Sequence, residues 1–210
     1  MRPASSNPVE ERSPDDLGRF GWGMKSASFS QARRLTVLTN DGSELSGAAW
    51  DLDNLDSWRM ESLDSDEVAS QCDQSLRANA GTEIIWDKCD RLSEGSTVDQ
   101  RAFNDAVAFA QRKLGLTFHR YISGEAKDRR TLKLFVNGIQ VPQVDPFHRE
   151  HPATQSLEEE PLQLPGYGVI TVRPYILPHY SKLRNDEMEA LAGEEGLVKN
   201  QGFYVYRNDR

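Results

Sequence analysis

The residues that are best suited to chemistry form a glycine-rich segment near the start of the chain. Glycines stand at positions 18, 21 and 23, and Lys25 and Ser26 follow. Because glycine has no side chain, such a segment can turn sharply and bring its backbone close to a ligand. A helix that begins directly behind it presents its first N–H groups and the positive end of its dipole to an anion. The segment therefore predicts a polyphosphate site, bound mainly by backbone N–H groups and by Lys25.

Two commoner phosphate-binding motifs do not fit this segment. A P-loop requires a glycine directly before its Lys-Ser/Thr pair, and Met24 stands there instead. The dinucleotide-binding fingerprint requires a third glycine where Ser26 stands, and a strand before the loop that the sequence does not indicate. On the pattern alone, a plain glycine-rich turn before a helix explains the segment equally well.

A second group of candidate ligands lies in a proline-flanked loop. His148, Glu150 and His151 are close neighbours there, and two imidazoles with a carboxylate can bind a metal ion. Their spacing fits neither the His-Glu-x-x-His helix motif nor its inverse. We therefore interpret this segment as a solvated loop.

Other titratable or nucleophilic side chains have simpler interpretations than catalysis. His119 falls at the end of a predicted helix and is typical of a packed or helix-end histidine. His179 and Ser181 lie two residues apart, but no orienting acid or oxyanion site accompanies them. Asp51 and Asp53 would share one face of a strand, where paired carboxylates can bind magnesium or exchange protons. A strand end followed by an acidic turn is the simpler interpretation of that pair.

The glycine-rich segment must be positioned by the elements that follow it. Apolar periodicity and the Asn40-Asp41-Gly42 turn signal define these elements. We expect a helix over 24–33, paired strands over 34–39 and 45–52, a solvated acidic loop with a short helix over 53–73, and a strand over 82–86.

The second half of the chain has its own pattern. The strongest signal is Asn137-Gly138 between two alternating runs, which is typical of a hairpin. We expect a helix over 98–114 that Gly115 ends or bends, hairpin strands over 132–136 and 139–141, a strand over 168–172, a helix over 186–191, and an alternating segment over 201–206 with Phe203 and Val205 on one face.

Composition limits the classes of function. The 210 residues suit one large domain or two small ones, and the net charge of −8 argues against a nucleic-acid or membrane-surface protein. The only cysteines, Cys72 and Cys89, predict neither a zinc site nor a disulfide framework and suggest a reducing compartment. We find no transmembrane run and no apolar signal-peptide core, so we expect a cytoplasmic protein.

The glycine-rich segment, with residues 29–37 after it, resembles the second glycine box of the GHKL ATPases. This superfamily contains gyrase B, the large heat-shock chaperones, histidine kinases and MutL. The form of the box is most similar to that of MORC proteins and of bacterial heat-shock-chaperone-like ATP-binding proteins. Gly81-Thr82-Glu-Ile resembles the family's Gly-Thr strand, and residues 201–210 resemble the late strand of its transducer domain.

This resemblance implies a fold, a ligand and a site. The fold is α+β, with a partial Bergerat-type α/β sandwich (lid, helix and sheet) before a β-rich transducer-like domain. The implied parts are an arm over 1–17, the C-terminal part of the ATPase domain over 18–124, and an incomplete transducer-like domain over 125–210. The implied ligands are ATP and Mg²⁺. The implied binding residues are Gly18, Arg19, Gly21, Gly23, Met24, Lys25, Ser26 and Thr82.

The chain also departs from the family pattern. In the family, a catalytic Glu, a magnesium-binding Asn and an Asp-x-Gly-x-Gly loop all precede the lid, and residues 1–17 carry none of them. We therefore expect a chain that is truncated at both ends and that does not hydrolyse ATP alone. Trp22 is also bulkier than the usual residue between the two glycines.

Two functions from different classes remain open at this stage. In the first, the chain is a GHKL-type ATP-binding protein whose lid closes over ATP and which forms a homodimer as its relatives do. In the second, it is a non-catalytic interaction or dimerisation module, in a DNA-remodelling or defence context. Because the chain is acidic, we do not expect this segment to contact nucleic acid directly.

Overall fold

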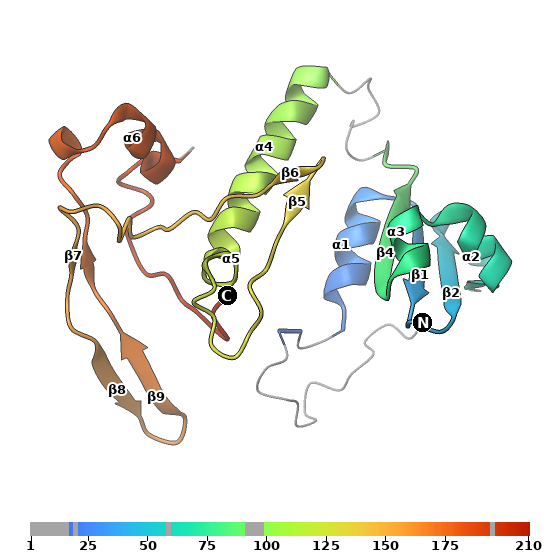
Figure 1. Ribbon diagram of the computed structural model, residues 1–210, viewed down its shortest axis with the longest axis horizontal. Coiled ribbons are helices and arrows are strands. Elements are labelled where there is room, and N and C mark those ends of the chain that lie inside the picture. Colours follow the sequence, from blue (N-terminus) through green and yellow to red (C-terminus); the bar gives the residue numbers. More distant parts are fainter. Residues whose placement is uncertain (1–16, 19–20, 58–59, 91–98, 194–195) are drawn as a thin grey trace. The chain divides into compact units, whose positions relative to one another are not determined.

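The computed structural model describes residues 17–18, 21–57, 60–90, 99–193 and 196–210. The chain divides into two compact units, residues 1–103 and 104–210, which are described separately here. Helix and sheet are mixed in the chain, so the α+β fold class is confirmed (Figure 1). Among the described residues, no helix is long and apolar enough to cross a membrane.

The first unit is built around one four-stranded antiparallel sheet with the strand order β3-β2-β1-β4. Its elements in chain order are α1 (Gly23–Gln31), β1 (Arg34–Asn40), β2 (Leu45–Asp51), a 3₁₀-helix (Leu52–Ser57), β3 (Glu61–Leu63), α2 (Ser65–Gln71), α3 (Gln74–Ala78) and β4 (Gly81–Asp87).

The turn between β1 and β2 forms as the sequence predicts. Gly42 has a φ of 98°, and the Asp41 carboxylate accepts hydrogen bonds from the backbone N–H groups of Ser43 and Glu44 at 2.8 and 2.9 Å. These bonds and one from the Ser43 hydroxyl, which has the largest effect, lower the pKa of Asp41 to about 2. The turn thereby fixes the register of the hairpin, in which Asn40 pairs with Leu45.

The main core of this unit lies between the sheet and the helices α2 and α3. Leu38, Leu63, Val68, Cys72 and Leu76 are buried together there. The short helix expected within 53–73 is present as α2, but the rest of that segment is not simply a solvated loop, because it also contains β3 and contributes buried residues to the core. The acidic residues that suggested a loop instead start the helix: Asp64 caps α2 in a capping box with Glu67.

The opposite face of the sheet is covered by α1. Leu35, Trp50 and Trp86 lie opposite one another on β1, β2 and β4 and therefore share a face. Trp86 Nε1 donates a hydrogen bond of 2.9 Å to Ser28 Oγ, and the rings of Phe29 and Trp50 lie 6.1 Å apart. These contacts place α1 on this face and away from the core formed by α2 and α3.

The second unit combines helices with short two-stranded ribbons. Its elements are α4 (Gln100–Thr117), which begins in the first unit's range, α5 (His119–Ser123), β5 (Phe135–Val136), β6 (Ile139–Gln140), β7 (Gln155–Ser156), β8 (Glu160–Leu164), β9 (Gly168–Val172), β10 (Tyr175–Ile176), a 3₁₀-helix (Tyr180–Lys182) and α6 (Asn185–Ala192). The ribbons pair β5 with β6, β7 with β10 and β8 with β9. The Asn-Gly hairpin is thus present, and β8 is a strand that the sequence pattern did not predict.

Gly115 does not end α4, contrary to one of the two roles predicted for it. The helix continues to Thr117, and Gly115 is buried inside it. A Cβ added there would lie 2.5 Å from Pro142 O, and Val144 N donates a hydrogen bond to Gly115 O at 3.2 Å. The glycine is needed because a neighbouring loop packs directly on the helix backbone.

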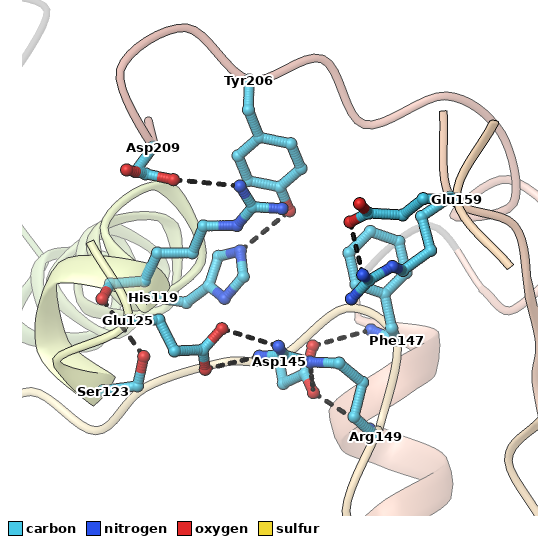
Figure 2. A network of polar contacts seen from close by, with 11 residues as sticks. His119, Ser123, Glu125, Asp145, Phe147, Arg149, Glu159, Tyr206 and Asp209 are labelled. Carbon is cyan, nitrogen blue, oxygen red and sulfur yellow. Dashed lines mark hydrogen bonds and ion pairs between the residues drawn. The ribbon is translucent and has the colours of Figure 1, made fainter. Parts of the chain in front are cut away.

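The C-terminal segment does not form a strand between residues 201 and 206. The alternation is real, but Phe203 and Val205 are 95% and 88% exposed, while Tyr204 and Tyr206 face inward. Tyr206 OH lies 2.8 Å from His119 Nε2 (Figure 2). Tyr121 OH donates a hydrogen bond of 2.6 Å to Asn208 O. The segment is therefore held by side chains on α5 instead of by a strand neighbour.

Candidate functional site

The glycine-rich segment leads directly into α1. Gly21 has a φ of 66°, a conformation that favours glycine. Gly23 begins the helix, and a Cβ added there would meet no described atom within 4 Å. The backbone conformation therefore explains the glycine at position 21, whereas neither a positive φ nor close packing against described residues explains the one at position 23. Gly18 is described and exposed, whereas Arg19 lies outside the described residues.

The start of α1 has features of an anion-binding end. Trp22 stands at the N-cap without a side-chain cap, and the first turn contains no acidic residue. Ser26 Oγ donates hydrogen bonds to Trp22 O at 3.0 Å and Gly23 O at 3.4 Å. The positive end of the helix dipole is thus not balanced by a carboxylate from its own first turn.

Lys25 lies on the side of α1 that faces the sheet. It is only 6% exposed, and Ser28 and Ala32, which follow it at helical spacing, are also buried. Met24 and Ser26 are exposed on either side of it. A ligand at the start of α1 would therefore meet Met24 and Ser26 first, and would meet Lys25 only between the helix and the sheet.

Thr82 lies near the beginning of β4, opposite Thr39 of β1. Thr39 Oγ1 donates to Gly81 O at 3.0 Å and lies 3.5 Å from Thr82 Oγ1. Side chains alternate along a strand, so Thr82 is on the same face as Trp86, which contacts α1.

The start of α1 and Thr82 lie at the same end of this face. Helix α1 and strand β1 run in opposite directions and are joined by a short connection, and β4 runs antiparallel to β1 (Figure 1). Helix α1 and strand β4 therefore both begin at the same end of the sheet. The hollow between Val37, Ala48 and Trp50 on this face measures about 10 Å³, so these described residues alone do not enclose a nucleotide.

Asp51 and Asp53 both form ion pairs with Lys88. Lys88 Nζ lies 2.8 Å from Asp51 Oδ2 and 2.7 Å from Asp53 Oδ2. The hydrogen bond from Lys88 is the main cause that lowers the pKa of both carboxyl groups. This ion-paired arrangement fits the interpretation as a strand end and acidic turn better than that of a magnesium site.

The Ser–His contact in the second unit belongs to a turn. His179 Nδ1 lies 2.9 Å from Ser181 Oγ and also accepts from Ser181 N at 3.3 Å. His179 thereby caps the 3₁₀-helix, and both side chains are exposed. A ring nitrogen that caps the backbone of the same serine is typical of a local cap and does not indicate a nucleophile pair.

Residues 1–82 match the sequence family described as histidine kinase-, DNA gyrase B-, and HSP90-like ATPase. This match supports the GHKL superfamily and ATP binding at the level of that family. Proteins of the superfamily generally use ATP with Mg²⁺ and often dimerise. Comparison with curated proteins and with solved structures gives no match.

Proposed function

We propose that this chain binds ATP through a GHKL-type phosphate lid, with residues 18–26 at the phosphates and Thr82 toward the adenine. In this proposal the second unit is the transducer-like part, and the glycine box is of the MORC-like form. The observation that carries the proposal is the family match over residues 1–82, which includes both the glycine box and Thr82.

Three features of the described residues support the lid role. The helix behind the glycines has no carboxylate in its first turn. Gly23 has open space around its α-carbon, which suits close approach of a phosphate. The start of α1 and Thr82 share one face and one end of the sheet.

Turnover in such a site requires a general base to activate water. Residues 18–26, which we place at the phosphates, include no carboxylate and no histidine, so their role in this proposal is to bind the nucleotide and not to activate water. Mg²⁺ bound with ATP would supply charge stabilisation at the phosphates.

Calorimetric titration with a non-hydrolysable ATP analogue and Mg²⁺ tests the proposal. The wild-type chain should release or absorb heat with one binding site, and Gly23→Ala should weaken binding at least about tenfold because its methyl group occupies the space left for phosphate. Ser30→Ala, at the far end of the same helix, is the matched control and should bind like the wild type. Equal affinity in all three proteins, or no heat at all, would contradict the proposal.

A second candidate function is a non-catalytic interaction or dimerisation module. The exposed β8–β9 ribbon supports it, because Leu162 and Ile170 are half-exposed opposite each other on this hairpin. Absence of nucleotide binding together with concentration-dependent association in light scattering would favour this function over the first.

A further inference from the structure

Two histidines and a glutamate from separate segments of the second unit come together. His148 and His151 lie in the loop before β7, and Glu187 lies in the first turn of α6. Each of the three offers one ligand atom, and these atoms lie within 4.8 Å of one another. The two imidazole rings stack with their centroids 5.2 Å apart. Glu150, the carboxylate that the sequence placed beside the histidines, is exposed and is not in this group.

Hydrogen bonds within the loop, and others from Arg149 to neighbouring carboxylates, fix the loop that contains His148 and His151. Thr154 Oγ1 donates to His148 O at 2.7 Å, and His151 N donates to the same carbonyl at 3.1 Å. Arg149, between the two histidines, binds Glu125 through two hydrogen bonds of 2.6 and 2.8 Å and Asp145 at 2.8 Å (Figure 2). The loop is therefore fixed by groups other than the three candidate ligands.

The glutamate is also oriented independently. Glu187 Oε2 accepts a hydrogen bond of 2.9 Å from Arg184 N in the capping box of α6. Its other oxygen, Oε1, lies 3.6 Å from His148 Nε2 and 3.2 Å from an Arg184 guanidinium nitrogen. One carboxylate oxygen is thus directed toward the histidines by the geometry of the helix start.

One polar atom in this group is buried without a hydrogen bond. His148 Nε2 is inaccessible to solvent and makes no hydrogen bond within the described part of the chain. Such atoms are rare in folded proteins, since burying them unpaired costs free energy. His148 also adopts a φ of +47°, which is uncommon for a residue other than glycine and strains the backbone. An ion at Nε2 would satisfy this nitrogen.

We propose that His148, His151 and Glu187 bind a divalent transition metal, with Zn²⁺ as the best match. Two imidazoles and one carboxylate form a known zinc ligand set that leaves a fourth position for water. Tetrahedral ligands at zinc distances lie about 3.4 Å apart, so the ligand atoms, which lie within 4.8 Å of one another, need to approach by at most about 1.4 Å. His151 now accepts from Ala153 N at 3.1 Å and contacts Lys182 O at 3.3 Å, and it would exchange one of these contacts for the ion.

Such a site would cross-link two segments of the second unit through the metal ion. The ion joins the loop that contains His148 and His151 to the start of α6, two segments more than 30 residues apart in the chain. Metal that binds the folded chain and not the unfolded one stabilises the fold in proportion to the logarithm of its concentration. This inference does not depend on nucleotide binding, because its residues lie outside the family match.

The test uses the full chain, stripped of metal with EDTA and titrated with ZnCl₂ and with CoCl₂ in the absence of nucleotide. We expect one ion per chain, a rise in the melting temperature with added Zn²⁺, and a visible Co²⁺ spectrum without a thiolate charge-transfer band. His148→Gln, His151→Gln and Glu187→Gln should each weaken binding by more than about 100-fold, beyond the 10–100-fold usual for loss of an outer-shell partner.

Two variants serve as matched controls. His179→Gln removes an exposed histidine outside the group, and Cys89→Ser removes the more accessible thiol; both should bind like the wild type. Circular dichroism of all variants in EDTA shows whether they fold, and the Co²⁺ spectrum of the wild type remains informative if one does not. Sub-stoichiometric binding by the wild type, a thiolate band, or unchanged affinity in the three ligand variants would overturn the proposal.

Discussion

His119 is a buried titratable residue of the second unit, and its surroundings lower its pKa. Its side chain is 1% exposed, its Nε2 pairs with Tyr206 OH, and its Nδ1 is buried without a hydrogen bond among the described residues. Burial is the main cause that lowers the pKa of His119, and burial also raises the pKa of Tyr206 to about 12. The sequence-based interpretation of a packed histidine agrees with this position.

We predict that His119 makes the fold less stable in mild acid. The folded chain holds its pKa below the ordinary value of about 6.5, so the unfolded chain takes up a proton first as the pH falls below that value. The free energy of unfolding should therefore be largest above about pH 6.5 and should decrease as the pH falls toward the folded-state pKa.

Urea unfolding between pH 7.5 and 5 measures this effect. His119→Gln should flatten the pH dependence relative to the wild type, and His179→Gln, which changes an exposed histidine, should leave it as it is. A wild-type curve that is as flat as that of His119→Gln would count against the prediction.

At the scale of elements, helix capping determines where α2 begins, and glycines allow neighbouring segments to pack closely against a strand or a helix. Helix α2 forms in an acidic segment because Asp64 and Glu67 satisfy its first N–H groups and each other. Gly47 of β2 allows Val68 of that helix to approach, since a Cβ on the glycine would lie 2.8 Å from the Val68 side chain. Gly115 likewise allows the loop around Pro142 to pack against the backbone of α4.

We predict that Gly115→Ala destabilises the second unit although alanine favours helices. The new methyl group would meet Pro142 O at 2.5 Å and the Val144 side chain at 3.1 Å, so the loop must move. Overpacking of this kind costs about 1–3 kcal/mol, which exceeds the gain of about 0.5–1 kcal/mol from replacing a helical glycine.

Chemical denaturation of the two variants Gly115→Ala and Gly23→Ala separates these effects. Gly23→Ala adds a methyl group in open space and should leave the unfolding free energy unchanged or slightly higher. Equal stability of Gly115→Ala and the wild type would mean that the contact between α4 and the loop is weaker than the structure indicates.

At the scale of the whole molecule, the two units bury their apolar residues to different degrees. The first unit has a core on one face of a four-stranded sheet. In the second, the ribbon β8–β9 exposes Leu162, Leu164 and Ile170, which lie on one face of the hairpin. A two-stranded ribbon is only marginally stable without cover, and GHKL proteins often dimerise.

We therefore predict that the chain associates with itself through this apolar face of the ribbon. Multi-angle light scattering should show a mass that increases with concentration, and the double change Leu162→Lys with Ile170→Lys should shift the protein toward monomer. Thr171→Lys, on the other face of β9, is the control and should associate like the wild type. Association that is equally strong in the double variant would place the interface elsewhere.

The sequence by itself determined the features that depend on near neighbours. Asn40-Asp41-Gly42 and Asn137-Gly138 specify their turns, because positive φ angles and side-chain hydrogen bonds act within a few residues. The alternation in 34–39 and the glycine box before α1 are likewise local, and both lie within the family match over residues 1–82.

Only the tertiary structure decided which distant segments meet. Glu187 joins His148 across almost 40 residues, and Tyr206 joins His119 across more than 80. Residue spacing carries no signal for such contacts, because they depend on how loops close and on which surface each element leaves open. The same reason explains why residues 201–206 looked like a strand: their partners on α5 lie far away in the chain.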